Sequence, residues 1–170
     1  MDLLVHADGL ALWGKERLRC ALGRAGISPQ KHEGDGATPQ GAFPMRRLLY
    51  RADRLSQPAT RLPLAAIARG DGWCDDPADP LYNRPVRLPY RARAEALWRE
   101  ESVYDLIVPL GYNDDPVTPG AGSAIFLHVA RESYAPTEGC VALAAADLLR
   151  VLAEADQNSR VVIDPAISPD

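Results

Sequence analysis

Ser123-Ala124-Ile125-Phe126-Leu127-His128-Val129-Ala130 is an apolar run whose length and composition predict a β-strand. In a strand, alternate side chains face opposite sides, so Phe126 and His128 share one face. The loop 131–139 follows, and its last three residues begin the run Thr137-Glu138-Gly139-Cys140-Val141-Ala142-Leu143. This loop is long enough to turn back on itself. The spacing therefore predicts that the Cys140 thiol lies beside the His128 imidazole.

A cysteine and a histidine in this arrangement predict a thiol nucleophile and its base. Free thiols are mostly protonated near neutral pH, and a neighbouring imidazole can accept the proton. Gly139 has no side chain to block the approach of a substrate to the sulfur. The backbone N–H groups around Gly139 and Cys140 are suited to stabilising a tetrahedral oxyanion. We therefore expect Cys140 to form a thioester, with His128 as its base.

The rest of the chain predicts a mainly β protein with two or three short helices, folded as a single domain over residues 1–170. Proline and glycine are frequent, with 15 and 13 residues, so the predicted elements are short. Strands are predicted at 3–5, 10–13, 16–22, 45–50, 104–110, 123–130 and 160–164. Helices are predicted at 91–101 and 144–156, and loops at 33–44 and 70–90.

The bulk composition is typical of a soluble globular protein and excludes several classes. The net charge is −4 and the chain has no long basic run, which argues against a nucleic-acid partner. No apolar run has the length of a membrane span, and the N-terminus shows no secretion signal. The three cysteines, Cys20, Cys74 and Cys140, form no Cys-x-x-Cys pair, which argues against a structural zinc site. Whether Cys20 and Cys74 are buried thiols or a disulfide is left open.

Two motifs resemble those of a known family. Ile125-Phe126-Leu127-His128, followed by Thr137-Glu138-Gly139-Cys140-Val141, is similar to the signature of L,D-transpeptidase catalytic domains of the YkuD type. Upstream, Gly36-Ala37-Thr38-Pro39-Gln40-Gly41-Ala42-Phe43 resembles the Thr-Pro-x-Gly-x-Phe segment of those domains. The likeness extends over residues 3–164, in matching order.

The resemblance implies a β-sandwich with the catalytic cysteine in a cleft, and peptidoglycan stem peptides as donor and acceptor. The cysteine would attack the bond after the diamino acid of a stem tetrapeptide, release D-Ala, and pass the acyl group to an amine of a second stem. The backbone carbonyl of Val129 would orient His128. A carbapenem should then acylate Cys140. No metal and no organic cofactor is implied. The substrate implies the periplasm or cell envelope, and we expect a monomer.

The chain departs from the family pattern beside the nucleophile. Family members commonly have Ser/Thr-His-Gly-Cys, followed after one residue by Arg or Asn. This chain has Glu138 in place of that histidine and Ala142 in place of the Arg or Asn. The spacing from His128 to Cys140 is also shorter than usual. A carboxylate beside a thiolate raises the pKa of the thiol. We therefore expect Glu138 to point away, to pair with a cation such as Arg131, or to meet an ammonium of the substrate.

Polar and aromatic loop residues supply the candidates for substrate binding. They are Trp73, Tyr82, Asn83, Tyr112, Asn113, Arg131, Tyr134, Thr137 and Glu138. The sequence leaves the acceptor open, so the cross-link is either 3–3 or 1–3. Two other functions also stay open. One is a cysteine carboxypeptidase or amidase that uses water, and the other is a wall-binding module in which Cys140 is only a packed core residue.

Overall fold

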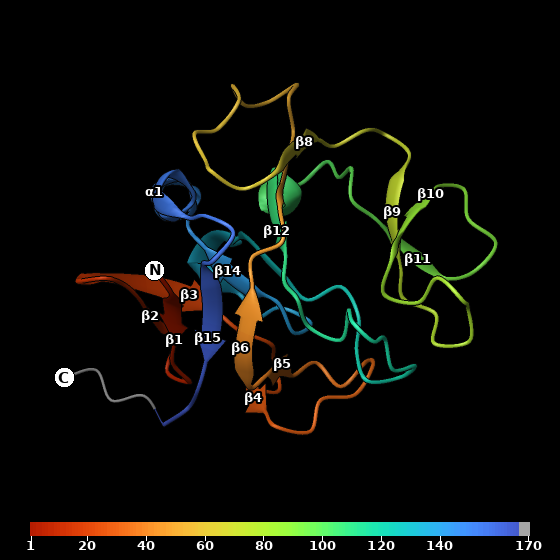
Figure 1. Cartoon of the computed structure of the whole chain (residues 1–170), viewed down its shortest axis with the longest axis horizontal. Coiled ribbons are helices and arrows are strands. Elements are labelled where there is room, and N and C mark those ends of the chain that lie inside the picture. The colour runs from red at the N-terminus through yellow and green to blue at the C-terminus, as the bar shows by residue number, and fades with distance from the viewer. Residues whose placement is uncertain (167–170) are drawn as a thin grey trace.

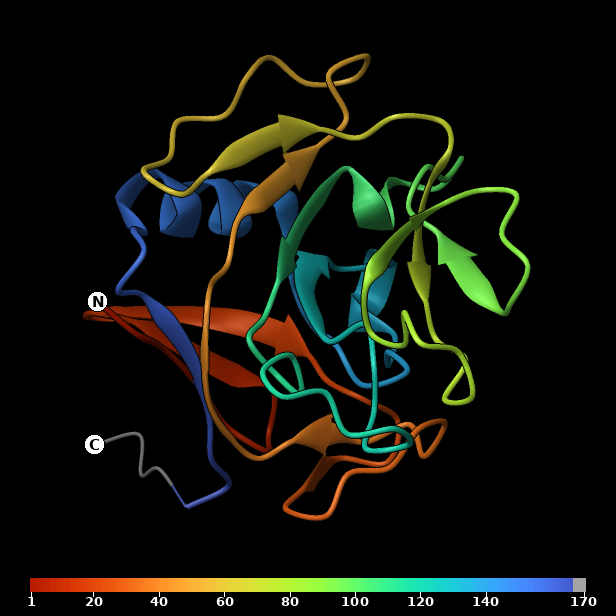
Figure 2. The same ribbon diagram turned by 45° about the vertical axis from the view of Figure 1, so that its right-hand side comes forward.

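The computed structural model describes residues 1–166, and its largest element is one strongly curled ten-stranded sheet (Figures 1 and 2). In order across the sheet, the strands are β6 (Gly41–Pro44), β15 (Arg160–Ile163), β1 (Leu3–Val5), β2 (Leu10–Trp13), β3 (Glu16–Ala21), β14 (Val141–Leu143), β13 (Phe126–Val129), β12 (Leu106–Pro109), β7 (Leu48–Tyr50) and β8 (Leu64–Ala66). The sequence-based prediction of a mainly β fold is confirmed.

The middle of this sheet is its most deeply buried part. Every residue of β12, β13 and β14 is buried, which matches their sequences, apolar throughout except for His128. β13 pairs antiparallel with β12 and parallel with β14. The single α-helix among the described residues, α1 (Ala145–Glu154), follows β14 directly. It buries Leu148, Val151 and Leu152 in the main core, as the predicted helix at 144–156 requires.

Strands β1, β2 and β3 confirm the predicted N-terminal strands. β2 and β3 form a hairpin in which Trp13 pairs with Glu16, so Gly14 and Lys15 make the two-residue turn. Gly14 has φ +59°, the left-handed conformation that glycine supplies at no steric cost in such turns. Leu3 and Val5 are fully buried, which explains the apolar residues of β1.

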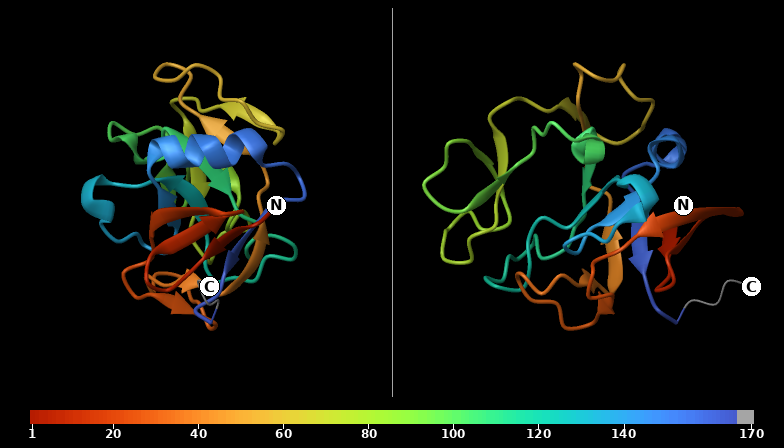
Figure 3. Two further views of the ribbon diagram at one scale, coloured as in Figure 1. Left: turned by 90° about the vertical axis from the view of Figure 1, so that its left-hand side faces the viewer. Right: turned by 180° about the vertical axis from the view of Figure 1, so that it is seen from behind.

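A second, smaller sheet lies beside the large one (Figures 1 and 3), and Trp73 of the small sheet packs against Phe126 of the large one. The small sheet is a three-stranded antiparallel sheet in which β9 (Asp71–Cys74) lies between β10 (Pro85–Arg87) and β11 (Ala94–Ala96). A two-stranded parallel ladder joins β4 (Ile27–Ser28) to β5 (Thr38–Pro39). Two 3₁₀ turns, Ser102–Tyr104 and Glu132–Tyr134, complete the described elements.

The predicted helix at 91–101 is wrong. Its centre is the strand β11, in which Glu95 pairs with Trp73 of β9. The helix preference of alanine, arginine and glutamate amounts to about 0.7 kcal/mol per residue at most, and tertiary contacts override it. In the extended chain the side chain of Arg93 donates a hydrogen bond to Asp75, and the side chain of Leu97 is buried.

Other boundaries also differ from the predictions. The segment 33–44, predicted as a loop, contains β5 and β6, because the edge of β15 offers β6 a pairing partner. The loop predicted at 70–90 contains β9 and β10, and the strand predicted at 45–50 begins only at Leu48. All three cysteines are free and buried, so Cys20 and Cys74 are not paired with each other.

Candidate active site

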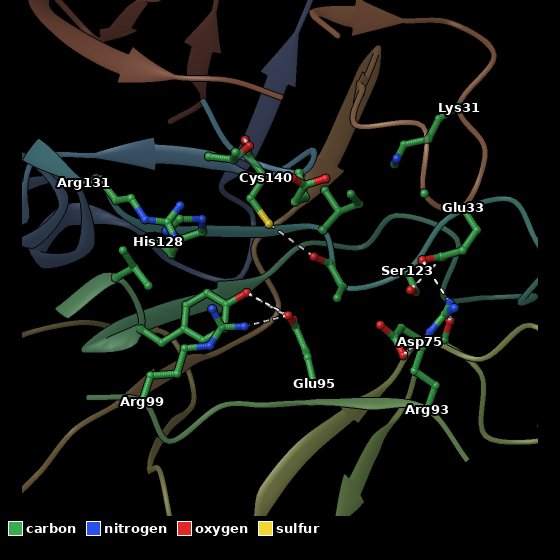
Figure 4. Close-up of a pocket in the computed structure, with 17 residues that line it drawn as sticks. Lys31, Glu33, Asp75, Arg93, Glu95, Arg99, Ser123, His128, Arg131 and Cys140 are labelled. Atoms are coloured by element: carbon green, nitrogen blue, oxygen red, sulfur yellow. Dashed lines mark hydrogen bonds and ion pairs between the residues drawn. The ribbon is translucent and has the colours of Figure 1, made fainter. Parts of the chain in front are cut away.

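Cys140 and His128 come together because β13 and β14 run parallel. In this ladder His128 pairs with Ala142, so Cys140, just before β14, lies level with Phe126. The backbone N–H of Phe126 donates a hydrogen bond of 3.3 Å to Cys140 Sγ. Both side chains line one cavity of about 360 Å³, and Figure 4 shows the His128 ring beside the Cys140 sulfur. The structure therefore places the two side chains that the sequence singled out on the lining of the same cavity.

His128 is held as a neutral base. Its Nδ1 lies 2.9 Å from the backbone oxygen of Val129, and since a carbonyl only accepts, Nδ1 carries the proton. Nε2 is then the nitrogen with a free lone pair. The ring of Tyr104 packs edge-on against the imidazole, with ring centres 5.3 Å apart. Burial lowers the pKa of His128 to about 4, and the charges of Arg131 and Arg99 add to the effect.

Cys140 rests as a neutral thiol. Its S–H donates to the backbone oxygen of Ala124 at 3.2 Å. Burial raises the pKa of Cys140 to about 12, and the charge of Glu95 raises it further, while the Phe126 N–H opposes the shift. The resting pair is therefore a thiol and an imidazole, not a thiolate and an imidazolium. Proton transfer must accompany any attack by the sulfur.

The backbone before Cys140 requires glycine. Gly139 has φ +137°, and a Cβ at this position would lie 2.7 Å from the backbone oxygen of Ala37. Thr137 shapes the same turn, because its Oγ1 accepts from the Gly139 N–H at 3.1 Å and donates to the Cys140 carbonyl at 2.7 Å. The Gly139 N–H, expected in the oxyanion region, thus already has a partner in the resting structure.

The Thr38-Pro39 segment braces this turn from the other side. Thr38 is completely buried, and its Oγ1 accepts a 2.8 Å hydrogen bond from the N–H of Gly23. Gly23 forms a β-bridge with Thr137, whose N–H donates to the carbonyl of Leu22 at 2.9 Å. The two sequence motifs are thus parts of one structure, in which the upstream segment supports the cysteine loop.

Comparison with known proteins identifies the family. The model of the YkuD family, described as the L,D-transpeptidase catalytic domain, matches residues 3–163. The chain belongs to this family. Comparisons with curated proteins and with solved structures returned no match. The family acts on peptidoglycan, in the cell envelope.

Glu138, the departure from the YkuD pattern, points to the rim of the cavity. It forms an ion pair with Arg24, and 82% of its side chain is exposed. Its expected pairing with a cation is confirmed, but the partner is not Arg131. Arg131 lies on the cavity wall and pairs with Glu101 at 3.3 Å. Arg24 was missed because it precedes Glu138 by 114 positions, and no local pattern connects them.

Six of the candidates for substrate binding lie outside the lining of this cavity. They are Trp73, Tyr82, Asn83, Tyr112, Asn113 and Tyr134. Asn83 is buried, and its side-chain oxygen accepts from Trp73 Nε1 at 2.9 Å. The Tyr134 ring stacks with the guanidinium of Arg19, 4.4 Å away. Of the predicted set, Thr137, Glu138 and Arg131 do line the cavity.

The three remaining candidates, Tyr82, Tyr112 and Asn113, support neighbouring loops. The hydroxyl of Tyr82 donates to the carboxylate of Glu33 and accepts from the N–H of Gly122. The ring of Tyr112 packs edge-on against Phe43, with ring centres 5.3 Å apart. Asn113 donates to the carbonyls of Thr118 and Gly122. Their polar atoms are thus engaged within the protein.

The sequence missed the cavity wall that faces Cys140. Figure 4 shows Glu95 and Arg99 across the cavity from Cys140, with Glu33, Asp75, Arg93 and Ser123 at one end. Arg99 pairs with Glu95 at 3.1 Å, and the Tyr104 hydroxyl donates to the same carboxylate. Burial raises the pKa of Glu95 to about 7. The predicted helix at 91–101 concealed part of this wall, because Arg93 and Glu95 both line the cavity although residues two positions apart would lie on different faces of a helix.

Lys31 is a second missed feature of the cavity. Only 4% of its side chain is exposed, and its ammonium donates to Asp35 at 2.7 Å and to the carbonyl of His32 at 3.2 Å. A Cβ on Gly139 would lie 3.4 Å from Lys31 Nζ, so this cation lies beside the cysteine turn. A single lysine in a glycine-rich loop gives no signal by which the sequence alone identifies it.

Two other kinds of feature are absent from residues 1–166. No group of three or more His, Cys, Asp or Glu side chains in this range is placed to hold a metal ion. Within the same range, no helix has both the length and the apolar character to cross a membrane.

Proposed function

We propose that this YkuD-family protein is a cysteine L,D-transpeptidase that joins peptidoglycan stem peptides through a thioester on Cys140. The observation that carries the proposal is the cavity shared by Cys140 and His128, in which the Val129 carbonyl anchors Nδ1 of His128 and leaves Nε2 unprotonated. The family match over residues 3–163 supplies the class of substrate.

In the first half-reaction Cys140 Sγ attacks the carbonyl carbon between the diamino acid and the terminal D-Ala of a donor tetrapeptide. The thiol proton moves to His128 Nε2 as the S–C bond forms. The C–N bond then breaks, and His128 returns the proton to the amine nitrogen of the departing D-Ala. Because burial holds the pKa of His128 at about 4, the imidazole is available as a base throughout the neutral range.

In the second half-reaction an amine of another stem attacks the thioester carbon. His128 accepts the amine proton, the C–S bond breaks, and the sulfur leaves with that proton. An amine of the diamino acid gives a 3–3 cross-link, and the amine of the first stem residue gives a 1–3 cross-link. The cavity carries both signs of charge close to Cys140, including Lys31, Glu95 and Arg99, which suits a peptide with free amines and carboxylates.

Acylation by a carbapenem tests the nucleophile. Intact-mass measurement should show one covalent adduct on the wild type, mapped to Cys140 by peptide analysis. Cys140→Ala should show none, and Cys20→Ala should react like the wild type because Cys20 lies outside the cavity lining. The assignment fails if the wild type shows no adduct or if Cys140→Ala is acylated equally.

Muropeptide analysis tests the reaction. Purified protein incubated with stem tetrapeptides should yield cross-linked dimers and free D-Ala, and mass spectrometry of the dimers identifies the link as 3–3 or 1–3. Tripeptides without dimers would instead establish the hydrolase. A wild type that neither reacts nor cross-links would favour the wall-binding module, which the burial of Cys140 at 8% exposure supports.

A further inference from the structure

Ala124, the residue two positions before β13, has an unusual backbone. Its φ is +53°, in the left-handed region that side chains other than glycine rarely adopt. An alanine in this conformation needs neighbouring contacts that hold it there. Ala124 also lines the cavity of the candidate active site.

Asn83 supplies the contact that holds Ala124. Its Oδ1 accepts from the N–H of Ala124 at 3.0 Å and from Trp73 Nε1 at 2.9 Å. Its Nδ2 donates to the backbone oxygens of Tyr112 at 3.1 Å and Asn113 at 2.8 Å. With 4% exposure and four hydrogen bonds, the amide uses all of its donors and both acceptor positions inside the protein.

The conformation of Ala124 affects Cys140 through a hydrogen bond. The carbonyl of Ala124 accepts the S–H of Cys140 at 3.2 Å, which is the dashed line that leaves the sulfur in Figure 4. A hydrogen bond made by the neutral form of an acid stabilises that form, and the carbonyl dipole directs its negative end toward the sulfur. At rest the S–H of Cys140 therefore donates to the carbonyl of Ala124 and not to His128.

We propose that Asn83 is a positioning residue for the nucleophile, which holds Ala124 in the left-handed conformation so that its carbonyl is the resting acceptor of the Cys140 thiol proton. The catalytic meaning of this hydrogen bond rests on the function proposed above. To react, the S–H must turn from the Ala124 carbonyl to His128 Nε2. The vacated carbonyl lines the cavity, where a substrate N–H can take the place of the thiol.

The pH dependence of Cys140 alkylation tests the proposal without any substrate. The reagent is iodoacetamide, and peptide mapping separates Cys140 from Cys20 and Cys74. Asn83→Ala and Ala124→Pro both break the link, the latter because proline has no N–H and has φ near −65°. We expect each variant to lower the midpoint of the pH profile by about one unit and to speed alkylation at pH 8 roughly three- to tenfold.

Asp114→Ala is the matched control. It removes the ion pair of Asp114 with Arg46 and so loosens the same loop region, but it leaves the Asn83–Ala124 hydrogen bond intact. It should keep the wild-type midpoint. Folded Asn83→Ala and Ala124→Pro proteins with a wild-type profile would overturn the proposal, as would an Asp114→Ala profile shifted as far as theirs.

A measurement on the wild type covers the case in which the variants do not fold. The infrared difference spectrum of wild type minus Cys140→Ser isolates the S–H stretching band of Cys140. We expect the lowered frequency of a hydrogen-bonded thiol, and a band at the free-thiol frequency would overturn the proposal. Neither the alkylation profile nor the S–H stretching band depends on cross-linking. A protein that shows the Cys140–Ala124 hydrogen bond but makes no cross-linked dimers would therefore contradict the proposed function and leave the role of Asn83 standing.

Discussion

The two walls of the cavity are built in opposite ways. Cys140 and His128 come from the middle of the large sheet, where every residue of β13 and β14 is buried and the backbone ladder fixes the position of each side chain. On the facing wall, Glu95 and Arg99 are held by an ion pair of 3.1 Å whose side chains are 24% and 29% exposed. The first wall is held by buried backbone pairing, and the second is held by charged side chains that are partly exposed.

The two walls affect the pKa values of Cys140 and His128 in different ways. Burial dominates the pKa shifts of both Cys140 and His128, so the inner wall keeps the pair neutral at rest. The charge of Glu95 is the next contribution to the raised pKa of Cys140. We therefore expect substitutions on the inner wall to abolish function or folding, and substitutions on the facing wall to change rates and pH profiles.

The largest expected effect is at His128. His128→Gln keeps a polar side chain of similar size but removes the base, so carbapenem acylation of Cys140 should slow by about 10²–10⁴-fold. Stopped-flow or mass-spectrometric acylation rates measure this loss. In the wild type the contribution of His128 should be constant from pH 6 to 8 and should decline only as the pH falls through about 4. An acylation rate in His128→Gln equal to that of the wild type would remove His128 from the mechanism.

The next effect concerns the backbone of the inner wall. In Gly139→Ala the new Cβ would lie 2.7 Å from the Ala37 oxygen at φ +137°, so we expect the free energy of unfolding to fall by about 1–3 kcal/mol. Gly26→Ala is the control, because Gly26 also has a positive φ, +77°, but has no atom within 4 Å of the added Cβ. Urea denaturation of both variants separates the steric contact from the conformational strain. Equal losses would show that the contact contributes nothing.

The smallest expected effect is on the facing wall. Glu95→Gln removes a carboxylate whose charge raises the pKa of Cys140, so alkylation at pH 8 should become about two- to fivefold faster. The Tyr104 hydroxyl keeps an acceptor in the glutamine oxygen, so the fold of this wall should persist. A slower reaction in Glu95→Gln would instead show that the carboxylate assists the thiol.

Glu95 also gives a pH dependence of stability with a definite sign. Burial raises its pKa from 4.5 to about 7, so the folded state binds a proton more tightly than the unfolded state. This contribution is fully present below pH 4.5 and is lost as the pH rises through 7. Between pH 5 and 8 the wild type should therefore lose stability that Glu95→Gln retains, as measured by urea denaturation at each pH.

The sequence predicted the inner wall well and the facing wall poorly. The strand that carries His128 and the helix after Cys140 follow from apolar periodicity within a few residues, which is a local signal. The helix predicted at 91–101 was wrong because its residues prefer a helix in isolation, whereas β9 offers a pairing partner from elsewhere in the chain. Asn83 was expected to bind substrate, yet the structure uses its amide to hold Ala124.

What the sequence by itself determined is that Cys140 and His128 share one site, and both line the same cavity. The apolar strand that carries His128 and the short loop after it are local signals for this arrangement. The parallel register that brings Cys140 level with Phe126, and the steric requirement for glycine at position 139, are seen only in the structure. Only the tertiary structure decided the surroundings of that pair. They include the Arg24–Glu138 ion pair, the facing wall and the Ala124 carbonyl, which accepts the S–H of Cys140. The reason is physical, because backbone periodicity is encoded locally, whereas these polar contacts join residues up to 114 positions apart and exist only once the sheet has closed.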